Sequence, residues 1–150
     1  FEIAVLDIAS CDRETAQAKI FQSKILYISG GNTFYLLQEL KKKQLLSLIK
    51  EQIRDGLIYV GESAGAIITA KDIDYNKLMD DKTVAKELSD TTGLDEVEFY
   101  ILPHYGEEPF TDSSKKTFET YKNQLDLMRM NNSQAVVVND KEIKVVSEQD

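Results

Sequence analysis

A serine between two glycines, in Gly61-Glu62-Ser63-Ala64-Gly65, is the part of this sequence best suited to covalent chemistry. An apolar run precedes it at residues 57–60, and a second apolar run follows at residues 66–70. A short buried strand, a glycine-flanked serine and then a helix are typical of a nucleophile elbow. We therefore predict that Ser63 is a nucleophile at the carboxyl end of a strand. The backbone N–H of Ala64 would then be free to bind an oxyanion.

A nucleophilic serine needs a base to take up its proton, and this chain contains one histidine, His104. It is the only imidazole available to Ser63. Pro103 comes directly before it and follows the apolar run Phe99–Leu102. We predict that His104 lies at the end of a strand and acts as the general base.

The elements that must position these residues follow from the pattern of apolar side chains. We predict strands over Phe1–Ile8, Lys24–Ile28, Leu57–Val60, Phe99–Leu102 and Leu127–Met130, and a C-terminal hairpin of residues 134–138 and 142–146. We predict helices over Asp12–Phe21, Phe34–Lys41, Leu45–Arg54 and Thr111–Gln124. Residues 71–95 are polar and read as a long excursion with one short helix.

Two of the predicted helices have recognisable starts and apolar faces. Asp12 is the expected N-cap of the first helix, and Asn32 or Thr33 of the second. The buried face of the first helix is expected to be Ala16, Ile20 and Phe21, and that of the second Phe34, Leu37 and Leu40.

Strands that alternate with helices predict an α/β fold with a mostly parallel sheet covered on both faces. Ligands of such sheets bind beyond the carboxyl ends of the strands. The glycine turn at residues 30–31, the serine elbow and His104 all follow predicted strands. We expect them to meet at one edge of the sheet.

The turn Gly30-Gly31-Asn32-Thr33 allows two interpretations. It can simply connect a strand to a helix, or a glycine N–H in it can be a second oxyanion donor. A phosphate site is disfavoured because the turn is neither a P-loop nor a G-x-G-x-x-G motif.

Composition limits the remaining functions. The 150 residues suit a single domain, and the net charge of −8 argues against nucleic-acid binding. No apolar stretch approaches the length of a membrane span. One cysteine, Cys11, excludes an intrachain disulfide and fits a reducing cytoplasm. We expect no metal site, because one histidine and scattered acidic residues lack ligand spacing.

Three motifs together resemble the peptidase E (S51) family: GGNTFYLL at 30–37, YVGESAGAIITA at 59–70 and ILPHY at 101–105. The resemblance implies a three-layer α/β/α sandwich similar to the class I glutamine amidotransferases, in a single domain over residues 1–150. Family members are usually longer at the N-terminus by about one strand and one helix. We therefore expect that this chain lacks that segment.

The resemblance also assigns site residues. It implies Ser63 as nucleophile and His104 as base, with the N–H groups of Gly31 and Ala64 as oxyanion donors. The third member of the family's triad is acidic, but the matching position here is Asn132, beside Asn131. An asparagine oxygen can orient the imidazole but cannot stabilise its charge.

Two acidic residues and two lysines remain open as functional candidates. Asp126 or Asp140 could replace the missing acid of the triad. Family members hold a substrate carboxylate with a basic residue downstream of the histidine, where this chain offers Lys115 and Lys116. A lysine pairs with a carboxylate only as a point charge, so preference for N-terminal aspartate is an open question.

Two further residues are candidate substrate contacts. Glu62, next to the nucleophile, could bind a substrate α-amino group or be solvated. Asn32, in the glycine turn, is the second of these contacts.

These observations favour a cytoplasmic serine exopeptidase that needs no cofactor, acts on short peptides through an acyl-enzyme, and is a monomer or homodimer. The alternative is a catalytically inactive family member that binds a small ligand or a partner.

Overall fold

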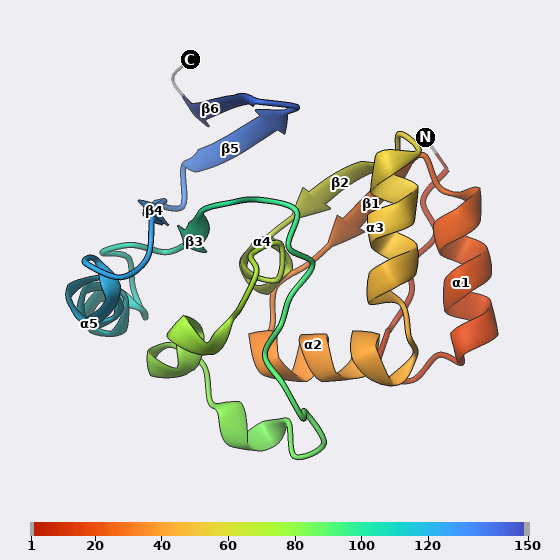
Figure 1. Ribbon diagram of the computed structural model, residues 1–150, viewed down its shortest axis with the longest axis horizontal. Coiled ribbons are helices and arrows are strands. Elements are labelled where there is room, and N and C mark those ends of the chain that lie inside the picture. The colour runs from red at the N-terminus through yellow and green to blue at the C-terminus, as the bar shows by residue number, and fades with distance from the viewer. Residues whose placement is uncertain (1, 149–150) are drawn as a thin grey trace.

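A computed structural model describes residues 2–148 of the chain (Figure 1). Helices and short strands alternate along it. In chain order the elements are α1 (Arg13–Gln22), β1 (Ile25–Ile28), α2 (Thr33–Lys42), α3 (Leu46–Arg54), β2 (Ile58–Gly61), α4 (Ala64–Ile67), the 3-10 helices η1 (Asp74–Leu78) and η2 (Lys82–Val84), β3 (Tyr100–Leu102), α5 (Thr111–Tyr121), β4 (Leu127–Arg129), β5 (Gln134–Asn139) and β6 (Glu142–Ser147).

The strands form three pairs. Two pairs are parallel, as the α/β prediction requires, and the third is the antiparallel hairpin. β1 and β2 are parallel, with Ile28 opposite Gly61. β3 and β4 are also parallel, with Leu102 opposite Arg129. β5 and β6 form the predicted C-terminal antiparallel hairpin. The fold is therefore mixed α/β, with parallel strands followed by an antiparallel hairpin.

One continuous sheet covered on both faces was expected, and the described residues instead form three two-stranded sheets. Nor are the strands β1 and β2 buried on both sides, because Tyr27 is 57% exposed and Ile58 is 58% exposed. Apolar strands alternating with helices predict parallel pairing, but they do not specify which strands share hydrogen bonds. That choice depends on how the helices between the strands pack.

The predicted first strand is also absent. Phe1 lies outside the described residues, and residues 2–7 have no regular structure. Ile3 is 83% exposed and Val5 is 91% exposed. An apolar run becomes a strand only when a neighbouring strand accepts its backbone hydrogen bonds, and no strand among residues 2–148 pairs with this one.

The two helix starts occur where expected. The Asp12 side chain accepts a hydrogen bond from the Thr15 N–H at 2.6 Å, and Asn32 accepts one from the Tyr35 N–H at 3.0 Å. The predicted face of α2 is buried as expected. On α1, however, Phe21 is 59% exposed, because it follows buried Ile20 by one residue and so points about 100° away.

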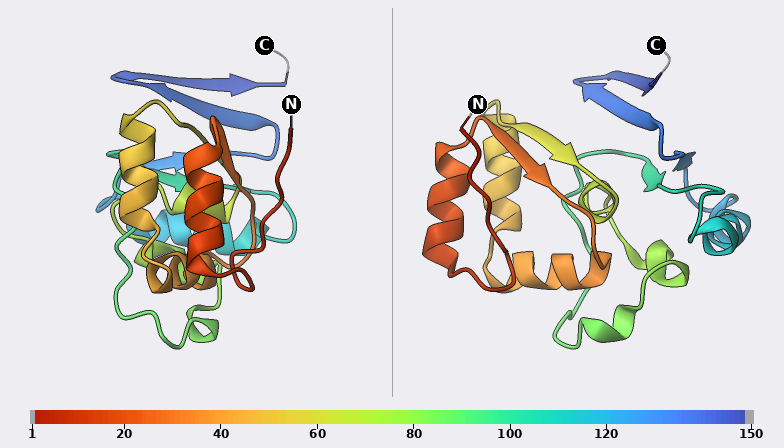
Figure 2. Two further views of the ribbon diagram at one scale, coloured as in Figure 1. Left: turned by 90° about the vertical axis from the view of Figure 1, so that its right-hand side faces the viewer. Right: turned by 180° about the vertical axis from the view of Figure 1, so that it is seen from behind.

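The hydrophobic core consists of a large cluster and a small one. The large cluster gathers buried side chains of α1, α2, α3 and α4. The small cluster has three buried members, Phe99, Ile101 and Met130, beneath the hairpin. Helix α4 packs against β1, β2, β3 and α2, so it joins the two parts. Figure 2 shows the hairpin standing away from the helical part of the molecule.

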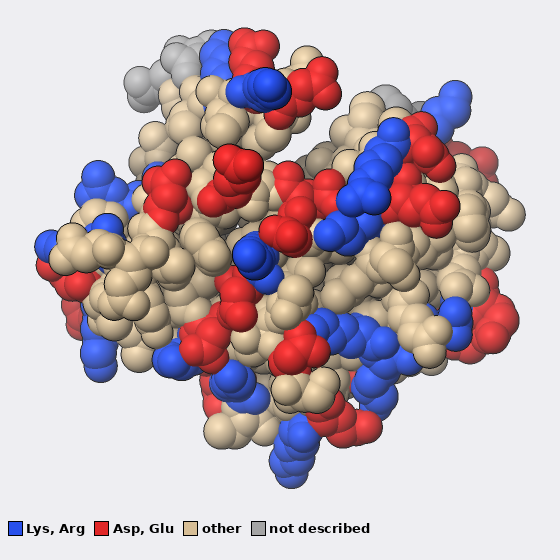
Figure 3. Space-filling view, in the orientation of Figure 1, with Lys and Arg blue, Asp and Glu red and all other residues tan. Residues whose placement is uncertain are grey.

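The surface carries charges of both signs. Acidic and basic side chains are interspersed over the face drawn in Figure 3. Among the described residues, no helix is both long and apolar enough to span a membrane.

Candidate active site

The turn between β2 and α4 has the geometry of a nucleophile elbow. Ser63 sits at φ 49° and ψ −109°, a conformation that L-residues seldom adopt. The two glycines around it are required by space. A Cβ on Gly61 would lie 2.5 Å from the Gly65 carbonyl oxygen, and one on Gly65 would lie 2.1 Å from the Ile28 carbonyl oxygen of β1. No residue with a side chain fits either position without moving the backbone.

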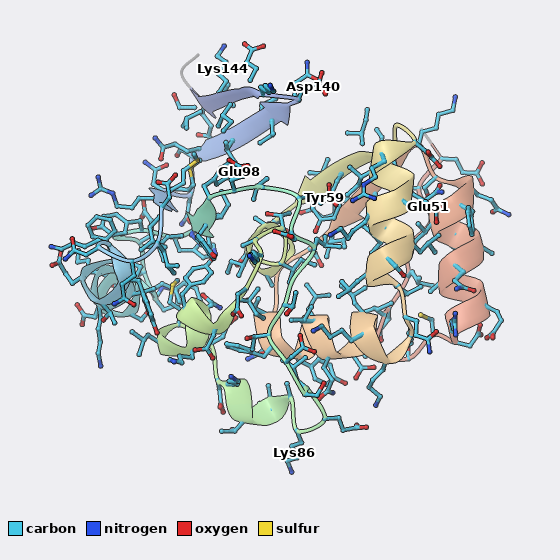
Figure 4. The ribbon with its side chains drawn as sticks, viewed as in Figure 1. Glu51, Tyr59, Lys86, Glu98, Asp140 and Lys144 are labelled. Atoms are coloured by element: carbon cyan, nitrogen blue, oxygen red, sulfur yellow. The ribbon has the colours of Figure 1, made fainter. Side chains whose placement is uncertain are left out.

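A half-buried tyrosine braces the elbow from the preceding strand. The Tyr59 hydroxyl, labelled on β2 in Figure 4, donates a hydrogen bond to the Gly65 carbonyl oxygen at 2.6 Å. Burial raises the pKa of Tyr59 well above its usual range, so this hydroxyl keeps its proton. The bond ties the first turn of α4 back to the strand that precedes Ser63.

His104 reaches Ser63 from a distant part of the chain. It follows β3 in a left-handed backbone conformation, at φ 55°. Its Nε2 lies 2.9 Å from the Ser63 Oγ, although the two residues are 41 positions apart. Its ring stacks on Phe110, with centroids 5.0 Å apart and planes at 21°. The structure thus brings together the two residues that the sequence predicted as nucleophile and base.

Asn132 completes the chain of hydrogen bonds. Its Oδ1 lies 2.7 Å from the His104 Nδ1. Because an amide oxygen can only accept, the proton of the neutral imidazole is on Nδ1, and Nε2 is free to accept the Ser63 hydroxyl proton. The neighbouring Asn131 has another task, since its Oδ1 accepts the Ser133 N–H at 3.0 Å.

The pairing of β3 with β4 brings these residues together. The Met130 N–H donates to the Leu102 carbonyl at 2.9 Å, and the Tyr105 N–H donates to the Met130 carbonyl at 2.9 Å. These two bonds continue the hydrogen bonding between β3 and β4 past the ends of both strands. His104 and Asn132, which follow these strands, therefore lie side by side.

Neither alternative acid bonds to the histidine. Asp140 lies at the tip of the hairpin (Figure 4), and Asp126 contributes its carbonyl to the Tyr100 N–H at 2.8 Å. Among the described residues, the partner of the His104 Nδ1 is Asn132.

The two predicted oxyanion donors lie beside Ser63. A Cβ on Gly30 would lie 3.3 Å from the Ser63 Cβ, so the glycine turn after β1 touches the elbow. Gly31, at φ 137°, lines the same cavity as Ser63. Within residues 2–148, the N–H groups of Gly31 and Ala64 have no hydrogen-bond acceptor. Both are therefore available to a ligand.

A cavity of about 350 Å³ opens beside Ser63 and His104. Residues from four parts of the chain line this cavity, and none of them is a lysine or an arginine. Its lining residues are Gly31, Asn32, Ser63, Ile67, Asn76, Met79, Asp80, Pro103, His104 and Phe110.

Two polar residues of this cavity, Asn76 and Asp80, were missed by the sequence analysis. They belong to the polar excursion at residues 71–95, which forms two 3-10 helices instead of one short helix. Nothing in their types or spacing marks them. The only available signal is the length of this excursion, because long loops in compact domains are often functional.

The Asp80 carboxylate ties this excursion to the glycine turn. Its Oδ2 accepts three hydrogen bonds: from the Thr33 N–H at 2.8 Å, the Thr33 hydroxyl at 2.6 Å and the Asn76 amide at 2.9 Å. The Asn32 amide also donates to the Asp81 carbonyl at 2.9 Å. The excursion therefore fixes the start of α2.

The predicted substrate contacts are mostly elsewhere. Glu62 is exposed and accepts a hydrogen bond from the Tyr27 hydroxyl, which raises the pKa of Tyr27. Lys115 and Lys116 are exposed on α5, and none of these three lines the cavity. Asn32 does line it, although both ends of its amide bond to backbone groups. Their substrate roles stay predictions.

Metal chemistry was not expected, and no cluster of three potential metal ligands occurs within residues 2–148.

Comparison with known proteins identifies relatives over nearly the whole chain. The family model described as peptidase family S51 matches residues 1–146. An uncharacterised peptidase of Pasteurella multocida is 42% identical over 141 residues, covering 94% of this chain and 68% of that protein. A Shewanella peptidase E is 39% identical over 80 residues, covering 53% of this chain and 32% of that protein.

Solved structures agree with the sequence comparison. A crystal structure of a candidate peptidase E from Listeria monocytogenes superposes with a TM-score of 0.88 at 36% identity. The match covers 95% of this chain and 68% of that one. A peptidase from an acI-B1 actinobacterium matches with a TM-score of 0.68 at 22% identity, covering 96% of this chain and 58% of that one, and this likeness concerns the fold alone.

Proposed function

The chain belongs to peptidase family S51, and from this premise we propose that it is a serine exopeptidase that cleaves short peptides. The observation that carries the proposal is the chain of hydrogen bonds Ser63–His104–Asn132, with links of 2.9 and 2.7 Å. Ser63, the first residue of this series, lies in a strained elbow beside a cavity of about 350 Å³. That volume suits a small ligand such as a short peptide.

The proposed reaction begins with proton transfer. The His104 Nε2 takes the Ser63 hydroxyl proton as the Oγ attacks the scissile carbonyl carbon. The carbonyl oxygen becomes an oxyanion, held between the N–H groups of Gly31 and Ala64. Protonated His104 then gives its proton to the leaving amine as the C–N bond breaks. Water, activated by His104, hydrolyses the acyl-enzyme and restores Ser63.

Asn132 has a limited part in this reaction. Its oxygen accepts the Nδ1–H bond and keeps the imidazole in the tautomer that the reaction needs. As a neutral group it stabilises the charged imidazolium less than a carboxylate would. We therefore expect slower turnover than a triad with an acidic third member would give.

Several finer parts of the proposal rest on the family resemblance. They are a three-layer sandwich similar to the class I glutamine amidotransferases in a single domain, a cytoplasmic location, and a preference for N-terminal aspartate through Lys115 or Lys116. A panel of dipeptides that compares Asp-Xaa with neutral Xaa-Xaa tests the preference.

The alternative function is a catalytically inactive member of the family that binds a small ligand. Asn132 in the acidic position is the observation that favours it.

Labelling with a fluorophosphonate, which reacts with activated serines, separates the two functions. We expect labelling at Ser63 that is lost in Ser63→Ala and His104→Ala. Ser47→Ala, which removes an exposed hydroxyl of α3, is the matched control and should label normally. A folded protein that does not label at Ser63 contradicts the peptidase proposal and favours the binding protein.

A further inference from the structure

Asp80 is the one acidic residue among those that line the cavity beside Ser63. Its Oδ2 is occupied by three donated hydrogen bonds, two from Thr33 and one from Asn76. Within residues 2–148, no group donates to its Oδ1. One oxygen of this carboxylate is thus engaged in holding the fold, and the other is available to a ligand.

Asn76 adds a second unused acceptor to the same cavity. The residue is 1% exposed, and its amide nitrogen donates to the Thr33 Oγ1 at 3.0 Å and to the Asp80 Oδ2 at 2.9 Å. Turning the amide over would place its oxygen against the carboxylate, so this orientation is fixed. Its Oδ1 is then buried without a hydrogen-bond partner. Such an acceptor is costly unless a ligand donates to it.

Within residues 2–148, the charge of Asp80 also lacks an oppositely charged partner. The cavity contains no lysine or arginine. Lys77 and Lys82, on the neighbouring 3-10 helices, both pair with Asp74, at 2.6 and 2.7 Å. A carboxylate oxygen and an amide oxygen that both lack donors are complementary to a ligand group that is cationic and carries several N–H donors. A primary ammonium has both properties.

We propose that Asp80 and Asn76 bind the α-ammonium group of the peptide's N-terminal residue, so that the enzyme acts on peptides with a free N-terminus. This inference rests on the proposed peptidase function. In an exopeptidase that removes one residue, the α-amino nitrogen is separated from the scissile carbonyl carbon by a single Cα. The group that binds it must therefore lie in the same cavity as Ser63, as Asp80 does and the exposed Glu62 does not.

The test measures how well dipeptides protect Ser63 from fluorophosphonate labelling. Each unblocked dipeptide of a panel is compared with its N-acetylated form, which has the same side chains but no ammonium. In the wild-type protein we expect acetylation to raise the concentration needed for protection by about 10- to 100-fold, the usual range for a hydrogen bond to a charged group.

Asp80→Asn is the informative variant. Its amide oxygen can keep the three bonds that Oδ2 accepts, and its NH2 then replaces the free acceptor with a donor. We expect this variant to unfold at a similar temperature and to lose the discrimination against acetylated dipeptides, when protection is measured relative to its own labelling rate without competitor. Asp81→Asn, which removes the same charge from an exposed neighbour, should keep that discrimination.

The outcomes separate the two proposals. If Ser63 does not label, the peptidase proposal fails. If Ser63 labels but acetylated dipeptides protect as well as unblocked ones, or no dipeptide protects, the ammonium subsite is wrong. If discrimination survives in Asp80→Asn but is lost in Glu62→Gln, the ammonium binds at Glu62 instead.

Discussion

The proposed nucleophile and its proposed base come from two regions that are built very differently. The elbow region, residues 25–70, contains β1, β2 and three helices and contributes most of the large hydrophobic cluster. The histidine region, residues 99–148, has a cluster with three buried members, Phe99, Ile101 and Met130. Ser63 belongs to the first region, and His104 and Asn132 belong to the second.

This difference separates two ways of positioning a reactive group. Ser63 is fixed by its immediate neighbours, because Gly61 and Gly65 leave room for nothing but hydrogen. His104 is fixed by pairing between distant segments, since its partner Asn132 is 28 residues away. Damage to the elbow region should therefore unfold the protein, whereas damage to the histidine region should first remove activity.

The largest effect is expected at Asn132. Asn132→Ala removes the acceptor that orients His104 and should lower kcat/KM by about 10³-fold, or about 4 kcal/mol. Because the Asn132 side chain is exposed, the unfolding temperature of this variant should be close to that of the wild type. Asn132→Asp, which can accept the same Nδ1–H bond, is the control and should stay within about tenfold of the wild type. A wild-type labelling rate in Asn132→Ala would mean that another group orients the histidine.

In the elbow region, substitutions should lower the stability of the protein. Gly65→Ala places a methyl group against the Ile28 carbonyl and should destabilise the protein by about 3 kcal/mol or more, measured by chemical denaturation. Gly56→Ala is the control, because Gly56 has φ 99° but no heavy atom within 4 Å of an added Cβ. It should lose only about 1 kcal/mol from backbone strain. Equal losses would contradict the requirement for close packing at the elbow.

The small cluster offers a third comparison. Met130→Ala should cost about 2 kcal/mol, near the lower limit for core truncations, because few neighbours surround it. Hydrogen exchange should show residues 100–132 opening before the elbow region. Ile49→Ala, in the large cluster, should cost about 3 kcal/mol but leave the activity per folded molecule unchanged. Uniform opening in both variants would show that the two regions unfold as one unit.

The smallest loss of stability is expected from removing either of two tyrosine hydroxyls. The Tyr59 hydroxyl donates to the Gly65 carbonyl within the elbow region, and the Tyr75 hydroxyl donates to the Ile101 carbonyl of β3. Removing either hydroxyl by substitution to Phe should cost about 1 kcal/mol. Denaturation curves at pH 8 measure the loss.

These tyrosines also predict a dependence on pH. Burial raises the pKa of both above the ordinary value of 10.0, so the folded protein binds protons that the unfolded chain releases. Their contribution is fully present below pH 10 and is lost as the pH rises beyond it. Denaturation at pH 8 and pH 11 should show a smaller alkaline loss in either Phe variant than in the wild type.

Local patterns predicted much of this molecule. The serine elbow, the N-caps Asp12 and Asn32 and the apolar face of α2 each depend on residues within a few positions of one another. Asn132 was predicted by alignment to a family motif, and the structure places its amide on His104. The N-caps, the elbow turn and the face of α2 were predicted correctly because backbone conformation and helical periodicity are short-range properties, whereas the catalytic role of Asn132 stays a prediction.

Two of the predictions that failed have different causes, one the lack of a pairing partner and one the rotation between successive residues of a helix. The expected strand at Phe1–Ile8 has no partner among the described residues, and Phe21 is exposed where a buried side chain was expected. Asp80 and Asn76 gave no signal, because they reach the cavity through a polar excursion that the sequence leaves featureless.

The sequence by itself determined that this chain has a serine between two glycines and a single histidine, and it predicted that each follows a strand. Spacing and residue type suffice for that, since a tight turn needs particular residues at particular positions. Only the tertiary structure decided that His104 lies 2.9 Å from Ser63 and that a free carboxylate oxygen lies in the same cavity. Those distances depend on the packing of α4 against β3 and on the pairing of β3 with β4, which no local pattern specifies.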